Sequence, residues 1–314
     1  MKLQDQSDIY DLIKKYPQQF ERGFRLAEPV RLSKNVKEII LCATSYNTPV
    51  AEIVADIFGR EAHPPYFVHQ GYDLPHATSS ESLVIAISVC GKRPEVISAA
   101  HMAYSQKANL VIVTSGGELE NFARERSLPL ILIDKANPEF HFRMAGGIMF
   151  AIITQILINA GVLSPKTRQQ ILAAGQNIEK MYLTKQGSKL AEMIADTSVL
   201  VYAPNQYSGV AHFLKHLLNI FIPLPSWTNE IPAVRYSEIY SLQRKGLAKY
   251  FALILKDPSA DARLQDDTKK LQEQFSDDKI KHYILELPGA DYLEKSLAAL
   301  MLFYWTIYAL LQKK

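Results

Sequence analysis

The sequence predicts an α/β protein with two domains, each built on a parallel β-sheet with helices on its faces. The chain has 314 residues, which exceeds what a single hydrophobic core usually holds. Five short runs rich in β-branched residues lie between residues 37 and 133, and four of them are separated by segments with helical spacing. A similar pattern restarts near residue 199, which indicates a duplicated α/β domain.

Composition narrows the class of protein. Apolar residues make up 48% of the chain and charged residues 21%, which are globular values. The formal net charge is only +3, and no long run of Lys or Arg is present to follow a nucleic-acid backbone. We therefore expect no nucleic-acid partner. A small anionic ligand remains compatible with this charge, because it needs only a few local cations.

Several features bear on location. The first residues, MKLQDQSDIY, lack the apolar stretch of a signal peptide. Two apolar segments, 146–163 and 296–311, are too polar or too short for a membrane span, so we expect core or subunit-interface helices. With only Cys42 and Cys90, no disulfide framework is expected. These features favour a cytoplasmic protein without membrane contact.

The first half begins with an amphipathic helix at 8–24, interrupted at Pro17. The predicted strands of this half are 37–43, 66–69, 83–87, 110–114 and 130–133. Ser164-Pro165 interrupts the chain after the apolar helix at 146–163. We therefore place the domain boundary there, giving domains 1–163 and 164–314.

The second half begins with two polar helices at 166–183 and 188–194. Strands are predicted at 199–203, 250–255 and 282–287, and helices at 210–221, 263–275 and 292–311. The segment WTNEIPAVRYSE, residues 227–238, is interpreted as a loop.

The stretch 81–95, ESLVIAISVCGKRPE, is the most informative part of the chain. A buried strand ends in Ser88 and Gly91, and Lys92 and Arg93 follow directly before Pro94, which suits a first helical turn. Hydroxyls, backbone N–H groups and two cations thus meet at one turn, which favours a bound phosphate or carboxylate. The alternative is an ordinary turn with exposed basic residues.

A second hydroxyl-rich turn follows the first predicted strand, with Thr44 and Ser45 at its start. Its alternative role is a plain helix cap by Thr48. In a parallel sheet, ligands bind at the carboxyl ends of the strands, where Ser45, Ser88 and Thr114 all fall.

Three segments resemble a known family: GYDLP at 71–75, SLVIAISVCGKRPEVISAAHMA at 82–103 and ANLVIVTSGGELENFA at 108–123. They are similar to the first sugar isomerase (SIS) domain of the bifunctional phosphoglucose/phosphomannose isomerases. The resemblance implies two SIS-type domains, each a flavodoxin-like three-layer sandwich. It also implies a homodimer that interconverts aldose and ketose 6-phosphates without a cofactor or metal.

The resemblance places the phosphate in the βα turns. The family's SYSGNT turn corresponds to residues 88–93, where Ser88 and Gly91 match and Cys90 and Arg93 replace a Ser and a Thr. Ser45 is the remnant of the family's GGS turn, and Arg143 lies near the position of a family Pro-Arg pair. The candidate substrate-binding residues are Thr44, Ser45, Ser88, Cys90, Gly91, Lys92, Arg93 and Arg143.

The family's catalytic pair is not matched. Its carboxylate base falls on Ile220 and its histidine on Tyr236, and a C-terminal segment with a lysine has no counterpart before Lys314. Glu230 and His216 are the candidate substitutes, with His212 on the same helix face as His216. A surface or interface role for the histidines, and a helix-start or solvated role for Glu230, are the alternatives.

Two functions follow from these matches. The first is a phosphosugar-binding SIS protein that isomerises hexose 6-phosphates, with Glu230 or His216 as the base. The alternative is a catalytically inactive homologue that binds sugar phosphate as a sensor or regulator. A Rossmann-type dehydrogenase is disfavoured because no GxGxxG motif follows a predicted strand.

Overall fold

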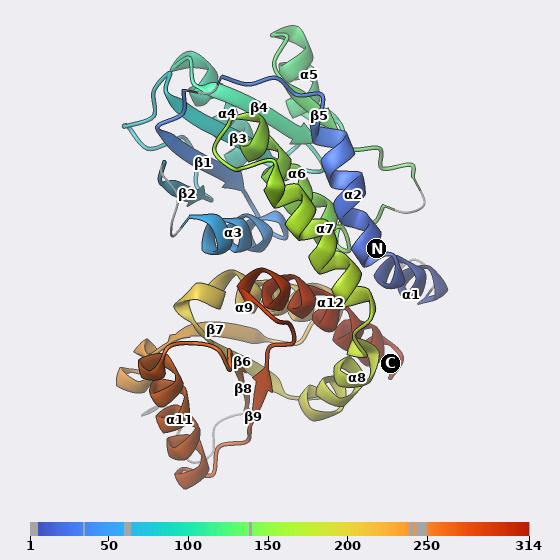
Figure 1. Cartoon of the computed structure of the whole chain (residues 1–314), viewed down its shortest axis with the longest axis vertical. Helices are drawn as coiled ribbons and strands as arrows, with labels where there is room; N and C mark the ends of the chain where they lie inside the picture. The colour runs from blue at the N-terminus through green and yellow to red at the C-terminus, as the bar shows by residue number, and fades with distance from the viewer. Residues whose placement is uncertain are drawn as a thin grey trace. The chain divides into compact units, whose positions relative to one another are not determined.

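The protein is described here by a computed structural model that covers residues 6–33, 35–59, 64–137, 140–238, 242 and 250–313 (Figure 1). The chain divides into two compact units. The first unit is Lys14–Glu179, and the second unit combines Met1–Ile13 with Lys180–Lys314.

The first unit contains a five-stranded sheet whose paired neighbours all run parallel. Its strands are β1 (Glu38–Ala43), β2 (Tyr66–His69), β3 (Ser82–Ile87), β4 (Asn109–Thr114) and β5 (Leu130–Leu132). Their order is β2-β1-β3-β4-β5, the order of flavodoxin-like folds. The expected parallel sheet is therefore confirmed for this unit.

Helices cover both faces of this sheet (Figure 1). They are α2 (Tyr16–Ala27), α3 (Asn47–Phe58), α4 (Pro94–Ser105), α5 (Gly117–Glu125), α6 (Gly146–Asn159) and α7 (Lys166–Glu179). Val84 and Ala86 point into the core formed with α4 and α5, while Leu83 and Ile85 are fully buried on the other face. Both faces are apolar because both are covered.

The second unit contains a four-stranded sheet, again with parallel pairing throughout. Its strands are β6 (Ser198–Pro204), β7 (Ser226–Ile231), β8 (Tyr250–Lys256) and β9 (His282–Glu286), in the order β7-β6-β8-β9. This order repeats the first four positions of the other sheet. The repeated plan expected from the sequence is present at the level of strand order.

Helices again lie on both faces of the second sheet (Figure 1). The described helices of this unit are α1 (Gln6–Lys14), α8 (Leu183–Ile194), α9 (Ser208–Phe221), α11 (Ala262–Asp277) and α12 (Tyr292–Leu311), with the 3-10 helices η1 (Asn205–Tyr207) and η2 (Ala233–Tyr236). Phe275 of α11 packs against Tyr202 of β6 on one face, and α9 contacts β6 and β7 and packs against α12.

The structure differs from the sequence-based prediction at three places. The leading helix is two helices, because α1 ends at Lys14 and α2 begins at Tyr16 with Pro17 in its first turn. The compact units divide after Glu179 rather than after Leu163, since α7 packs on α2 through contacts such as Arg168 to Glu21 at 3.1 Å. The segment read as a loop contains β7.

Strand β7 was not predicted from the sequence because most of its residues are polar. Its sequence is SWTNEI, and within the described part of the chain it pairs with β6 alone, at the edge of the sheet. An edge strand has fewer neighbours to bury its side chains, so it lacks the apolar run of a central strand.

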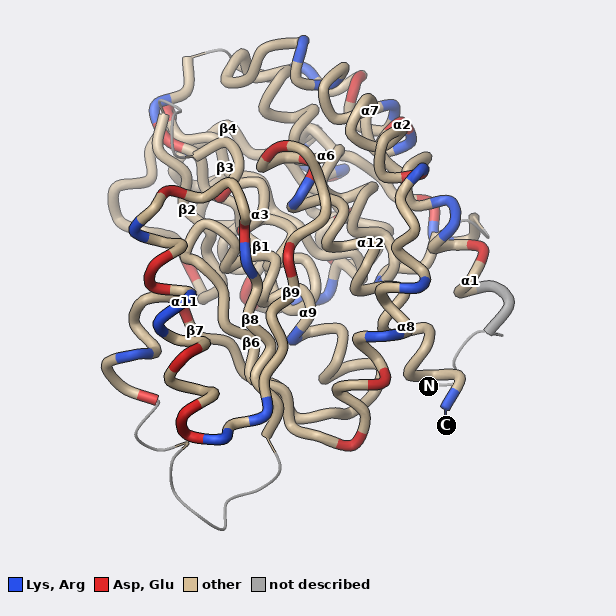
Figure 2. Tube along the Cα trace, turned by 60° about the horizontal axis from the view of Figure 1, so that its bottom comes forward, with Lys and Arg blue, Asp and Glu red and all other residues tan. Residues whose placement is uncertain are grey.

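The two apolar helices are core elements of their own units. Residues along nearly all of α6 and α12 are buried. Among the described residues, no helix is long and apolar enough to cross a membrane. Basic and acidic residues are interspersed along the described part of the trace (Figure 2).

Candidate functional site

The turns after β1 and β3 lie side by side in the first unit. These strands are neighbours, and Ala43 pairs with Ile87 at their carboxyl ends. After β1 the chain continues to β2 on one side of this pair of strands, and after β3 it continues to β4 on the other side. The strand order therefore reverses between β1 and β3. Ligands of open α/β sheets bind at such a point. The fold therefore brings Thr44 and Ser45 to the same edge as Ser88–Arg93.

The turn after β3 has a backbone that only glycine permits. Gly91 has φ of +64°, and a Cβ at this position would lie 1.7 Å from the Gly116 carbonyl oxygen. The neighbouring turn is held against it by Ser115 Oγ, which donates to the Val89 carbonyl at 2.6 Å. Ser88 is buried beneath this pair of turns.

Cations and backbone amides meet at the outer side of this turn. Lys92 and Arg93 are exposed, and Arg93 directly precedes α4. No described side chain caps the first amides of α4, and an uncapped helix start favours anions. The arrangement can hold an oxyanion by charge and by hydrogen bonds.

Cys90 lies in the same turn, and the pKa of its thiol is sensitive to the charges and hydrogen-bond donors of that turn. Its exposed thiol contacts Ser88 Oγ at 3.7 Å. Partial burial raises the pKa of the Cys90 thiol, but the Lys92 amide, Ser88 and the charge of Arg93 outweigh burial and hold the pKa below its usual value. This turn thus stabilises negative charge.

The turn after β1 has a different shape from a capped helix start. Thr48 Oγ1 donates to the Ala43 carbonyl at 3.0 Å, so Thr48 does not cap α3. Ser45 is exposed with φ of +59°. The Thr44 hydroxyl oxygen is buried, and no partner for it exists within the described part of the chain. The simple cap considered for this turn is therefore wrong.

Arg143 comes from a different segment of the first unit than the two turns. It belongs to the segment between β5 and α6, and β5 is two strands away from β3. Its guanidinium carbon lies 4.9 Å from the centre of the Phe142 ring. Burial lowers the pKa of Arg143. The pKa of His141 is lowered to about 4, mainly by burial and further by the positive charge of Arg143.

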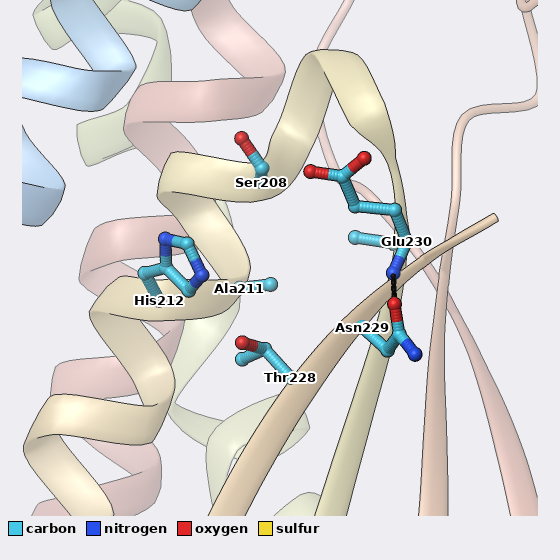
Figure 3. Close-up of a pocket in the computed structure, with 7 residues that line it drawn as sticks. Ser208, Ala211, His212, Thr228, Asn229 and Glu230 are labelled. Atoms are coloured by element: carbon cyan, nitrogen blue, oxygen red, sulfur yellow. Dashed lines mark hydrogen bonds between the residues drawn. The ribbon is translucent and has the colours of Figure 1, made fainter. Parts of the chain in front are cut away.

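The second unit has a polar pocket at the carboxyl ends of β6 and β7, beside the first turns of α9 (Figure 3). Thr228 and Glu230 point into it because alternate residues of β7 face the same side. The lining residues are Ala203, Ser208, Ala211, His212, Thr228, Asn229 and Glu230. A carboxylate, an imidazole and two hydroxyls thus share one pocket.

The structure brings Glu230 together with His212 rather than with His216. His212 lines the pocket, whereas His216 lies one helical turn further along α9 and its Nδ1 contacts the His212 carbonyl oxygen at 2.9 Å. Asn205 Nδ2 donates to Glu230 Oε2 at 2.9 Å, which orients the carboxylate. The sequence analysis did not single out Ser208 and Thr228. Thr228 belongs to β7, which was not predicted, and without β7 nothing indicated that it lies beside Ser208 at the start of α9.

The positions that the family resemblance assigns to catalysis lie outside this pocket. Ile220 is near the end of α9, and Tyr236 is 74% exposed in η2. Glu238 faces elsewhere, because it accepts hydrogen bonds from Tyr202 and Asn229. Among the described residues, no cluster of His, Cys, Asp and Glu is arranged to hold a metal ion.

Comparisons with known proteins agree with this fold. Residues 184–312 match the family described as the bacterial phospho-glucose isomerase C-terminal SIS domain. The bifunctional phosphoglucose/phosphomannose isomerase of Aquifex aeolicus is 25% identical over 250 residues, which cover 78% of this chain and 75% of that protein. The enzyme of the same name from Caldicellulosiruptor bescii is 21% identical over 160 residues, covering 50% of this chain and 46% of its own length.

A solved structure matches almost the whole chain. Glucosamine-6-phosphate deaminase from Thermotoga maritima has a TM-score of 0.71 at 14% identity, covering 98% of this chain and 94% of that chain. The family match identifies residues 184–312 as a SIS-type domain, and the solved structure shares the fold of almost the whole chain. In sequence, the chain is similar to the bifunctional phosphoglucose/phosphomannose isomerases.

Proposed function

We propose that this protein binds a hexose 6-phosphate, with the phosphate held by the turns after β1 and β3. One observation carries the proposal: a glycine-dependent turn and an uncapped helix start lie beside two exposed cations, Lys92 and Arg93. Neither cation forms an ion pair with another described residue. A phosphate dianion would supply the missing charge, and arginine can bind it through two hydrogen bonds.

The phosphate site is proposed to use Thr44, Ser45, Ser88, Cys90, Gly91, Lys92 and Arg93, with Arg143 as a further cation of the first unit. The hydroxyls and amides of these turns would accommodate the phosphate oxygens, while Lys92 and Arg93 would replace the polar residues of the family's turn. The relatives support a sugar 6-phosphate as ligand, because their names describe phosphoglucose and phosphomannose isomerases.

The proposal extends to the domains and the assembly. We take the two compact units, which divide after Glu179, as two SIS domains, because the second sheet repeats the strand order of the first. The family resemblance further predicts a cytoplasmic homodimer. Light scattering on the purified protein would give twice the chain mass if this is correct, and the single chain mass if it is wrong.

The binding proposal is tested by thermal unfolding with glucose, mannose and fructose 6-phosphates, 6-phosphogluconate and an N-acetylhexosamine 6-phosphate. A ligand that binds only the folded protein raises the melting temperature by mass action. We expect at least one of these compounds to do so. No response to the whole panel would contradict the proposal.

Variants of the turn locate the binding. Arg93→Ala removes a charged hydrogen-bond donor and should weaken affinity by roughly 10- to 100-fold, and Ser88→Ala by about 5-fold. The matched control is Lys166→Ala, which removes an exposed cation at the start of α7 in the same unit. Equal losses in Arg93→Ala and Lys166→Ala would show that only net charge matters.

Isomerisation is the second candidate function, and the pocket with Glu230 and His212 favours it. Glu230 would take the proton from C2 of the open-chain aldose while protonated His212 gives a proton to O1, forming an enediol. Protonated Glu230 would then return a proton to C1, and His212 would accept the proton of O2, giving the ketose. The carbon and oxygen protons balance, and both residues return to their starting states.

Exchange of the C2 hydrogen with deuterium oxide detects enediol formation even if net turnover is slow. We expect Glu230→Gln to abolish this exchange and leave ligand binding unchanged. His212→Asn should lower it about 100-fold, whereas His216→Asn should have little effect. Binding without any exchange in the unmodified protein would favour the alternative, a catalytically inactive sugar-phosphate-binding or regulatory homologue.

A further inference from the structure

A buried charged cluster lies in the second unit at the place that corresponds to the phosphate turns of the first. It consists of Tyr207, Asp257, Ser259 and Lys295. Tyr207 belongs to η1 after β6, and Asp257 directly follows β8. Since β6 and β8 are neighbours and the strand order reverses between them, this is the ligand-binding crevice of the second sheet.

The Asp257 carboxylate is fully surrounded by donors. Lys295 Nζ lies 2.6 Å from Oδ1, and both the amide and the hydroxyl of Ser259 donate to Oδ1 at 2.8 Å. The Tyr207 hydroxyl donates to Oδ2 at 2.8 Å. Lys295 Nζ also contacts Ser259 Oγ. An ammonium, two hydroxyls and a backbone amide are the groups that proteins use to bind an oxyanion.

The ion pair of the cluster and Tyr207 are closed to solvent, while Ser259 is exposed beside them. The side chains of Lys295 and Asp257 are 4% and 6% exposed, and Tyr207 is completely buried. Gly289 has φ of +137° and packs against the first turn of α12, where a Cβ would lie 2.6 Å from the backbone nitrogen of Lys295. A second anion therefore has no access while Asp257 is in place.

Burial of the pair is not explained by stability alone, because well-packed apolar residues usually serve as well as a buried ion pair. The geometry points instead to an oxyanion site whose occupant is part of the chain. Burial raises the pKa of Asp257, but the hydrogen bonds from Lys295, Ser259 and Tyr207 outweigh it and keep the carboxylate charged.

We propose that the crevice between β6 and β8 is a second oxyanion site that the protein fills with its own Asp257 carboxylate. The site would accept a small carboxylate or phosphate if Asp257 were shortened. In the unmodified protein this crevice is filled, so the phosphate of a sugar phosphate binds in the first unit and not between β6 and β8.

The test is chemical rescue of the full-length Asp257→Ala variant by formate, which replaces the deleted carboxylate. Without formate the variant should melt well below the unmodified protein, because Lys295, Tyr207 and Ser259 lose their acceptor. Sodium formate should then raise its melting temperature by several degrees more than sodium chloride of equal ionic strength.

Two control variants sharpen the result. Asp266→Ala removes an exposed carboxylate paired with Lys270 at 2.5 Å and should show no specific response to formate. Asp257→Asn fills the same space without charge and should also be unresponsive. These melting experiments use no sugar phosphate, so their outcome is independent of the binding proposed for the first unit.

Each outcome decides the proposal. If Asp257→Ala does not fold alone, it should refold when formate is present during dilution from urea. Failure to recover with formate, or a variant as stable as Asp266→Ala without it, would overturn the assignment. So would an equal response to formate in the unmodified protein.

Discussion

The two sheets share a strand order, yet the crevices at their carboxyl ends have opposite chemistry. In the first unit, Lys92 and Arg93 are exposed beside a turn that requires glycine. In the second unit, Lys295 is buried and already bound to Asp257. The first crevice has cations without a described carboxylate partner, while the second contains cation and carboxylate together.

This difference indicates that the ligand-binding role of each unit depends on a few side chains and not on the fold. Both crevices lie where the strand order reverses, which is where fold-level reasoning places a ligand. In the second unit that place is closed, and the open polar pocket lies one strand away, between β6, β7 and α9. Function therefore has to be argued separately for each unit.

The largest expected effect comes from breaking the buried pair. Lys295→Met leaves the Asp257 carboxylate buried without its cation, which should lower the free energy of unfolding by about 3–5 kcal/mol in urea titrations. The control is Lys256→Met, since the Lys256–Glu286 pair is 32% and 61% exposed and should cost at most about 1 kcal/mol. Equal costs would remove the distinction between a closed crevice and an ordinary surface.

A smaller effect is expected from Gly91→Ala in the first crevice. The new Cβ would clash with the Gly116 carbonyl in a left-handed backbone conformation, so we expect a loss of about 2–4 kcal/mol and of phosphate binding. Gly71→Ala is the matched control, because its Cβ would meet only His69 at 3.5 Å. A stable Gly91→Ala variant that still binds ligand would show that the turn is not the site.

The smallest effect is a change in thiol reactivity. Because the pKa of Cys90 is lowered, its thiolate forms at lower pH than an ordinary thiol, and alkylation by iodoacetamide should rise at correspondingly lower pH. Burial raises the pKa of Cys42 to about 12, so Cys42 should remain unlabelled in the folded protein. Bound sugar phosphate should slow labelling at Cys90, and unchanged labelling at saturating ligand would argue against that turn.

The sequence was informative where a residue pattern carries its own physical signal. Apolar β-branched runs identified β3 and β4, and the spacing of Ser88, Gly91 and Arg93 identified the turn between strand and helix. Edge strand β7 has no such signal, so the sequence singled out Glu230 and His216 as candidates and did not show that Glu230 shares a pocket with His212. One helical turn separates the two histidines, and only the position of β7 decides between them.

The closed crevice was out of reach of sequence reasoning for a different reason. Asp257 and Lys295 are 38 residues apart, and neither belongs to a motif. Lys295 looks like a solvated residue at the start of an apolar helix, although it is buried. A contact between residues far apart in the sequence depends on how whole helices and strands pack. A local sequence pattern carries no information about that packing.

Hydrogen exchange followed by mass spectrometry tests most directly whether sugar phosphate binds to the first crevice and not to the second. The unmodified protein would be compared with and without the hexose 6-phosphate that most raises its melting temperature. We predict slower exchange in peptides covering residues 44–48 and 88–96, and no change in those covering 257–259 and 289–295. Protection of the second set alone, or of both sets equally, would contradict this account.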